Sequence, residues 1–151
     1  MDYKRFFGRS SEEVAKDLLG RLLVRNTEKG STSGKIIETG AYEGGNETPT
    51  RKGMKYAPGR LFLMKYRNSY LFNIATDKEV YPSCVEIRKL AFHDSDIQVA
   101  GAITKFFEVT LDLEGIVLGN EIEILGDPVD RSRIVSIKGK SGNCLGYFLI
   151  E

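Results

Sequence analysis

The sequence predicts a mixed α/β fold of the α+β type, in which a mainly antiparallel β-sheet is accompanied by few helices. Segments with the alternation or apolar character of strands outnumber those with helical periodicity. The connections between successive strand segments are short, which favours antiparallel pairing. A length of 151 residues suits one domain, so we expect residues 1–151 to form a single compact unit.

The first expected elements are a helix and two strands. Residues 10–20, "SSEEVAKDLLG", are typical of a helix, because Ser10 and Glu13 can form a capping box and Gly20 stands at the stop. Residues 21–26 follow as a strand, and a polar turn is expected over 26–34. Residues 34–43, "GKIIETGAYE", form the next strand.

The second half of the chain predicts more strands and one further helix. Glycine and proline in residues 43–60 indicate a loop. The later expected elements are a hairpin over 60–76 with its turn near Arg67-Asn68, a strand over 83–92, a helix over 95–107, and late strands over 115–126 and 132–150.

The composition argues against several classes of protein. Hydrophobic residues make up 41% and charged residues 28% of the chain, as in globular proteins, and no apolar run approaches the roughly 18 residues of a membrane span. The N-terminus lacks a signal-peptide core, so we expect an intracellular protein without a membrane partner. Cys84 and Cys144 are then expected to be reduced and buried. With His93 as the one histidine, we expect neither a metal nor another cofactor.

The positive charge is concentrated in one segment. Residues 50–73 carry six basic and no acidic side chains, which gives this segment a charge of +6. The net charge of the whole chain is +1, so the remaining residues carry −5. Aromatic residues are interleaved with these cations, a combination that suits phosphates and stacked bases. The tip "KYRN" could enter a DNA groove with Tyr66 as the wedge and Arg67 on a phosphate. A half-buried hairpin with a solvated outer face would give the same pattern.

The strand over residues 34–43 has a gap on one face. Side chains alternate along a strand, so Glu38, Gly40 and Tyr42 share a face and Thr39 lies on the other. A glycine between a carboxylate and an aromatic ring can mark close approach by a ligand or another backbone. The gap therefore makes this face a candidate binding surface.

Three further polar residues have two interpretations each. Glu86 and Arg88 share a face of an apolar strand, which favours a structural ion pair, although Arg88 could instead point into a pocket. Asn73, at the end of "SYLFN", could serve a turn or contact a ligand. His93 alone is more typical of a surface or core residue than of a catalyst.

Several motifs in order resemble the alkyladenine (3-methyladenine) DNA glycosylase family. They are "VAKDLLGRLLV", "GKIIETGAYEG", "TPTRKGM", "PGRLF", "YRNSYLFNIAT" and "CVEIRKL", and the resemblance spans about residues 10–125 and continues more weakly to the end. It implies a curved, mainly antiparallel sheet and a hydrolase without metal, acting in base-excision DNA repair. Such an enzyme flips a damaged purine from double-stranded DNA and hydrolyses its N-glycosidic bond. We expect a monomer.

The resemblance also implies roles for individual residues. Tyr42 would stack on the extruded base, Tyr66 would fill the hole in the duplex, Asn73 would lie at the pocket floor, and Arg88 would lie near the target nucleotide. Met64 replaces an aromatic residue beside the pocket. The DNA-contacting residues would be Arg51, Lys52, Arg60, Lys65, Tyr66 and Arg67.

The chain departs from the family pattern at the catalytic position. The family motif reads E-T-E-A-Y, and its second glutamate activates water, whereas Gly40 stands there in this sequence. A loop of about ten residues with a base-stacking histidine is also missing. Glu38 could lean into the space beside Gly40 as a substitute base, and Glu43 and Glu47 are weaker candidates.

These departures leave two main hypotheses open. The chain is either a glycosylase with altered specificity or activity, or a damaged-DNA-binding protein that does not cut. A structural or RNA-binding role ranks lowest. On the sequence alone, base release by a Gly40→Glu variant would identify a glycosylase scaffold that has lost its base.

Overall fold

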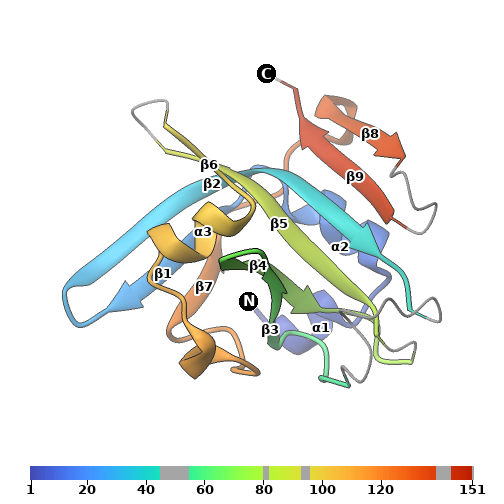
Figure 1. The fold of residues 1–151 in the computed structure, drawn as a ribbon. Helices are drawn as coiled ribbons and strands as arrows, with labels where there is room; N and C mark the ends of the chain where they lie inside the picture. The colour runs from blue at the N-terminus through green and yellow to red at the C-terminus, as the bar shows by residue number, and fades with distance from the viewer. Residues whose placement is uncertain (45–54, 80–81, 93–95, 139–143, 151) are drawn as a thin grey trace.

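The computed structural model describes residues 1–44, 55–79, 82–92, 96–138 and 144–150. Within these residues nine strands form one curled sheet, and every pairing is antiparallel (Figure 1). The strands are β1 (Leu22–Thr27), β2 (Gly30–Tyr42), β3 (Leu61–Tyr66), β4 (Ser69–Ala75), β5 (Cys84–Ala91), β6 (Ile97–Val99), β7 (Ile122–Leu125), β8 (Ile134–Lys138) and β9 (Cys144–Leu149). Their order is β3-β4-β5-β2-β1-β7, while β6 pairs with β5, β9 with β2 and β8 with β9. The predicted α+β class with a mainly antiparallel sheet is confirmed.

Strand β2 is the centre of this sheet. Its first half, from Gly30 to Lys35, pairs with β1, and its last five residues, from Glu38 to Tyr42, pair with β9. Strand β5 pairs along its other edge, with a register irregularity between Ile36 and Thr39. Such bulges bend a strand and strengthen its twist. The segment that contains Gly40 is therefore flanked by backbone on both sides.

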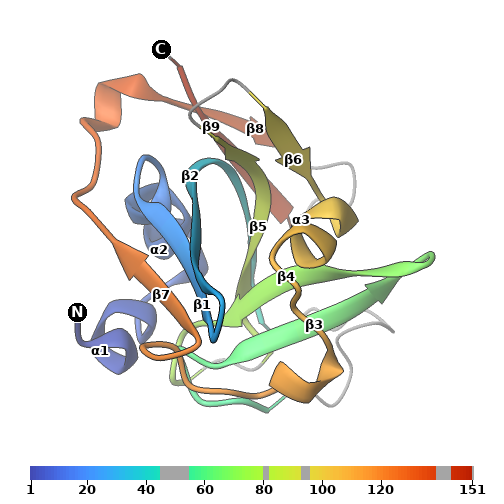
Figure 2. The same cartoon turned by 90° about the vertical axis from the view of Figure 1, so that its left-hand side faces the viewer.

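Three helices and two short 3-10 turns complete the described fold. They are α1 (Tyr3–Phe7), α2 (Ser11–Leu18), α3 (Gly101–Phe106) and the turns Leu111–Leu113 and Arg131–Arg133. Figure 2 shows α2 on one side of β2 and β5 and α3 on the other. Among the described residues, no helix is long and apolar enough to cross a membrane.

Helix α2 fixes which way β2 faces. Ser10 caps the helix as predicted, because its Oγ accepts a hydrogen bond from the Glu13 backbone N–H at 3.3 Å. The Thr39 hydroxyl donates to the carbonyl of Ala15 at 2.9 Å, and both residues are buried. Since neighbours on a strand face opposite ways, Gly40 faces away from α2.

Most buried apolar side chains belong to one hydrophobic cluster, and a second, smaller cluster contains Ala75 and Cys84. The largest buried members include Phe7, Leu18, Leu23, Ile36, Phe72, Ile87, Leu90 and Ile103. Strands β2, β4 and β5 contribute residues to this core, which fixes their positions. The polar side chains on these three strands therefore project from a rigid part of the fold.

The structure corrects several predicted boundaries. Helix α1 was missed, and β2 begins at Gly30, which leaves only a tight turn where a longer one was expected. The expected helix over 95–107 is strand β6 followed by α3, because Ala100, with φ of 44°, ends the strand and redirects the chain. The expected strand over 115–126 is reduced to β7.

The β3–β4 hairpin forms as predicted and its tip is exposed. Tyr66 pairs with Ser69 across the turn, and Arg67 adopts a left-handed conformation with φ of 54°. Figure 2 shows the hairpin projecting from the body of the sheet. Tyr66 remains 44% exposed, and the guanidinium of Arg67 lies 5.3 Å from its ring centroid. The tip is therefore available to an external partner.

Candidate active site

The gap at Gly40 belongs to a row of residues across three strands. Gly40 pairs with Glu86 of β5 on one side and with Gly146 of β9 on the other. Two glycines therefore lie side by side on this face, next to a glutamate. Such a row leaves room above the sheet that an ordinary side chain would fill.

The guanidinium of Arg88 occupies this room. A Cβ added at Gly40 would lie 2.5 Å from Cζ of Arg88, and a Cβ added at Gly146 would lie 2.9 Å from its Nη1. Real Cβ atoms do not approach other heavy atoms this closely, so both glycines are required for the observed position of Arg88. The side chain of Arg88 thus crosses from β5 over β2 towards β9.

Hydrogen bonds tie Arg88, Glu86 and Tyr42 together. Arg88 Nε donates to Oε1 of Glu86 at 3.2 Å, and Arg88 Nη2 donates to the hydroxyl of Tyr42 at 2.9 Å. That hydroxyl donates in turn to the same Oε1 at 3.1 Å. The expected ion pair of Glu86 and Arg88 is confirmed, and it includes the tyrosine as well.

The carboxylate of Glu86 is the buried charge of this group. Its side chain is 6% exposed, against 25% for Arg88. Burial raises the pKa of Glu86 above its ordinary value, although Arg88 and the Tyr42 hydroxyl favour the charged form. Perturbed carboxyls of this kind are concentrated at functional sites, where they serve in proton transfer.

A pocket of about 320 Å³ opens at this group. It is lined by Glu38, Tyr66, Leu71, Glu86, Arg88, Lys89, Val99 and Ala100. This volume is at the lower end of the range for small-ligand sites, about 300–1,000 Å³. The lining joins the buried carboxylate to the exposed hairpin tip, so a group held at the tip could reach Glu86.

Glu38 lies in the same pocket in a different environment. Its carboxylate forms an ion pair with Lys89 at 3.4 Å, and its side chain is 23% exposed. It does not enter the space beside Gly40, which Arg88 fills. Of the weaker candidates, Glu43 is exposed and Glu47 lies outside the described residues.

Asn73 and Met64 lie on the hairpin strands. Asn73 is fully buried; its amide donates to the Leu71 carbonyl at 3.4 Å, and its Oδ1 accepts from the thiol of Cys84 at 3.7 Å. Met64 is half-buried on β3, opposite Leu71. Cys84 is buried as expected, while the side chain of Cys144 lies outside the described part of the chain.

The cations of the basic segment are in different situations. Lys65 and Arg67 are exposed near the hairpin tip. Arg60 is half-buried, and its Nη1 donates to the Gly115 carbonyl at 2.8 Å. Arg51 and Lys52 lie outside the described residues, as does His93.

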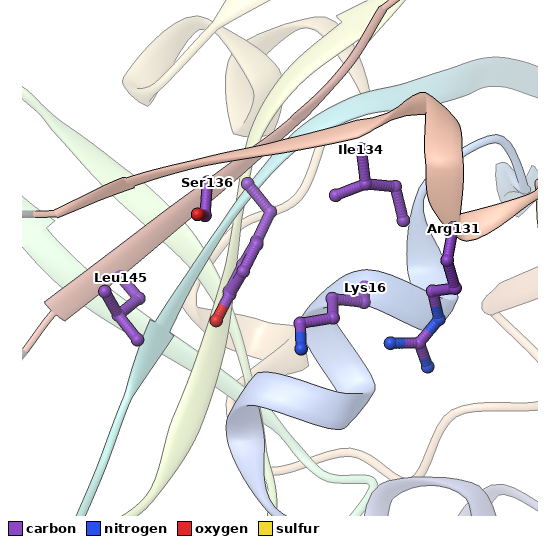
Figure 3. Close-up of a pocket in the computed structure, with 6 residues that line it drawn as sticks. Lys16, Arg131, Ile134, Ser136 and Leu145 are labelled. Atoms are coloured by element: carbon purple, nitrogen blue, oxygen red, sulfur yellow. The ribbon is translucent and has the colours of Figure 1, made fainter.

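A second pocket lies on the α2 side of the sheet. It measures about 340 Å³ and is lined by Lys16, Arg131, Ile134, Ser136, Leu145 and Tyr147. Figure 3 shows Lys16 and Arg131 close together beside this hollow. Arg131 donates to Glu13 and Asp17, at 3.0 and 2.8 Å, and Lys16 lies over the ring of Tyr147. Its cations are thus already engaged by neighbouring side chains.

Sequence reasoning located Tyr42, Tyr66 and Arg88 but not the arrangement that joins them. The position of Glu86 opposite Gly40 was not predicted, because nothing local in the sequence shows this pairing. Gly146 was missed for the same reason, since β9 is far from β2 along the chain. A pairing of Gly40 with Gly146 in the predicted sheet would have been the signal.

Fold and site together define an α+β protein whose polar pocket opens beside an exposed hairpin with cationic side chains. Comparison with known proteins gives the family. The model of the methylpurine-DNA glycosylase (MPG) family matches residues 5–105, which is more than half of the chain. The chain therefore belongs to this family, as the sequence motifs predicted.

Bacterial relatives agree with this assignment. A protein of Lactobacillus johnsonii is 34% identical over 101 residues, which are 60% of this chain and 49% of the relative. A protein of Desulfitobacterium hafniense is 35% identical over 96 residues, covering 56% and 47% of the two chains. One of Bacillus subtilis is 31% identical over 102 residues, covering 61% and 52%. Each is named as a candidate 3-methyladenine DNA glycosylase, and this chain spans about half the length of such relatives.

Proposed function

We propose that this chain hydrolyses the N-glycosidic bond of alkylated or deaminated purines in duplex DNA, the first step of base-excision repair inside the cell. Membership of the methylpurine-DNA glycosylase family supports a role in the repair of damaged DNA. A bond to a stacked base cannot be reached inside the helix, so the nucleotide must first be flipped out. The proposal therefore needs a wedge and a pocket that are close to each other.

The observation that carries the proposal is the position of Tyr66. This exposed aromatic residue lines the same pocket as Glu86 and Arg88. In the proposed complex Tyr66 fills the space left by the extruded base, which enters the pocket. The ring of Tyr42 is not part of this pocket's lining, and its hydroxyl holds Arg88 and Glu86 in place beside the base. Stacking of this ring on the base is what the family resemblance implies.

The DNA backbone would be held mainly by cations of the hairpin. Lys65 and Arg67 are exposed on either side of Tyr66 and are placed to contact phosphates. Arg51 and Lys52 add positive charge in the preceding segment. Arg60 contributes less directly, because its guanidinium is bound to a backbone carbonyl. Asn73 and Met64, buried or half-buried on the hairpin strands, would support the pocket from below.

The direct test is base release from defined duplexes. Purified protein is incubated with duplexes that carry 3-methyladenine or hypoxanthine, and the released base is measured by chromatography. The proposal expects release above the uncatalysed rate, and faster release from duplex than from single strands. Absence of release from every lesion in a panel of alkylated and deaminated purines would overturn it.

Replacement of Tyr66 by alanine separates the wedge from the phosphate contacts. Base–aromatic stacking contributes about 1–3 kcal/mol per base, so we expect Tyr66→Ala to weaken binding to a lesion duplex by about 10–100-fold. Its dependence on salt should stay unchanged. Arg67→Ala should instead reduce the slope of log affinity against log salt by about 0.9. Titrations at several salt concentrations measure both effects, and equal losses on undamaged duplex would argue against the wedge.

A damaged-DNA-binding protein that does not cut is the second candidate. It is favoured by Gly40, which supplies no catalytic side chain, and by Arg88, which fills the space beside it. Tight binding to a duplex with an abasic-site analogue, together with no turnover of any lesion, would support this function. The same preparations serve for both candidates.

A further inference from the structure

We infer that Glu86 of β5 is the carboxylate that activates water in this chain. It would replace the general base that β2 lacks, because position 40 of β2 is a glycine. This inference rests on the proposed function and assigns its base. Glu86 is the cross-strand partner of Gly40, on the neighbouring strand, and its side chain lines the pocket. Arg88 fills the space over Gly40, so a substrate bond would lie in the adjoining pocket, where Glu86 is part of the lining.

The hydrogen bonds of Glu86 leave one oxygen for water. Arg88 Nε and the Tyr42 hydroxyl both bind Oε1, at 3.2 and 3.1 Å. Among the described residues, no hydrogen bond reaches Oε2. A carboxylate held by one oxygen keeps a fixed orientation and can accept a proton from water at the other.

Glu38 is a poorer base by the same criteria. It is bound by Lys89 at 3.4 Å and its side chain is 23% exposed, against 6% for Glu86. An exposed ion pair with a flexible lysine does not fix the carboxylate in one orientation. Glu86 is held by two groups that are themselves bound to each other.

The pKa of Glu86 is shifted in the direction that suits a general base. The titratable or charged groups that face it are Arg88 and Lys89 of β5 and Tyr42 and Glu38 of β2. Burial and Glu38 raise the pKa of Glu86, while Arg88 and Tyr42 lower it, and the pKa remains above its ordinary value. A base is most effective when its pKa approaches the working pH.

The proposed step balances without a metal or an added reagent. Glu86 takes a proton from water as the water oxygen forms a bond to C1′ of the flipped nucleotide. The bond from C1′ to the purine nitrogen breaks, and its electron pair leaves with the base. A cationic alkylated purine departs neutral, whereas hypoxanthine departs as an anion that takes up a proton from solvent. Glu86 returns its proton to solvent before the next turnover.

The test compares variants of the whole chain in which single glutamates are replaced by glutamine or aspartate. Glu86→Gln should lower the single-turnover rate of release from a hypoxanthine duplex by at least 100-fold, the lower end of general-base effects. Glu28→Gln, at an exposed turn position, is the matched control and should keep the wild-type rate. Affinity for a duplex with an abasic-site analogue should change less than threefold in Glu86→Gln, which also shows that the variant is folded. Glu86→Asp should keep part of the rate.

Each outcome decides between defined alternatives. Wild-type release that persists in Glu86→Gln overturns the inference and leaves the proposed function intact. The same follows if Glu38→Gln, and not Glu86→Gln, abolishes release. No release by the wild type overturns the proposed function and the role of Glu86 with it. A wild-type rate that rises with pH through a pKa above that of an ordinary glutamate, in a profile that Glu86→Asp displaces, supports the inference.

Discussion

Replacement of Arg88 by methionine is expected to lower the free energy of unfolding by about 2–3 kcal/mol at pH 7. The guanidinium is the cationic partner of Glu86, whose side chain is 6% exposed, so its removal leaves a buried carboxylate with only the Tyr42 hydroxyl. Breaking a buried pair costs about 3–5 kcal/mol, and the lower figure allows for solvent access to Arg88, which is 25% exposed. Urea unfolding followed by circular dichroism measures the loss.

The same variant should become less destabilised in acid. The pKa of Glu86 is already raised in the folded protein, so its favourable contribution is complete below the unfolded pKa and is lost as the pH rises through the folded one. Removing Arg88 raises that folded pKa further. The difference between variant and wild type should therefore be large at neutral pH and shrink as the pH falls towards about 4.

Two further variants test this explanation of the Arg88 effect. Lys89→Met removes an exposed cation from the same strand and should cost less than about 1 kcal/mol, because its pair with Glu38 is solvated. Glu86→Gln added to Arg88→Met should recover most of the lost stability, since no buried charge remains. A loss of equal size at all pH values would mean that packing, not charge, is the function of Arg88.

Replacement of Gly40 by glutamate is expected to lower stability by about 1–3 kcal/mol and not to increase base release. The new Cβ would lie 2.5 Å from Cζ of Arg88, so the guanidinium must leave its position and give up its bonds to Glu86 and Tyr42. The variant would gain a carboxylate at position 40, but the carboxylate of Glu86 would lose the hydrogen bond from Arg88 that orients it. Base release in single turnover and thermal melting measure the two effects.

Thr32→Glu is the control for Gly40→Glu. It adds the same carboxylate to an exposed position of β2, away from Arg88, and should change neither property. Faster release by Gly40→Glu at unchanged stability would contradict the structure, because it would show that Arg88 does not occupy this space. The sequence motif suggests that Gly40→Glu would restore the catalytic glutamate and increase base release. The structure leads us to expect no increase.

Local features of the sequence predicted what depends on neighbouring residues. The hairpin and the exposure of Tyr66 follow from alternation and turn residues within one short segment. Predicted element boundaries were wrong where the conformation of a single residue overrides the hydrophobic pattern. An example is Ala100, whose positive φ separates β6 from α3. Alternation also placed Gly40 and Tyr42 correctly on one face of β2.

The centre of the site could not be predicted, because it depends on register between distant strands. Glu86 lies opposite Gly40 because β5 pairs with β2 in the register that places Lys35 opposite Ala91 and Tyr42 opposite Cys84, and Gly146 reaches the same row from the other end of the chain. Sequence comparison with the family favoured a search along β2 for a lost glutamate. The carboxylate that the structure brings to that position comes from β5.

The contribution of Gly146 has a consequence for biosynthesis. A ribosome delivers the hairpin, β2 and β5 before it delivers β9, which follows them in the chain. Until β9 docks on β2, Arg88 lacks half of the floor on which its guanidinium rests. The hairpin tip can therefore form early in synthesis, whereas the position of Arg88 is fixed only when β9 has docked.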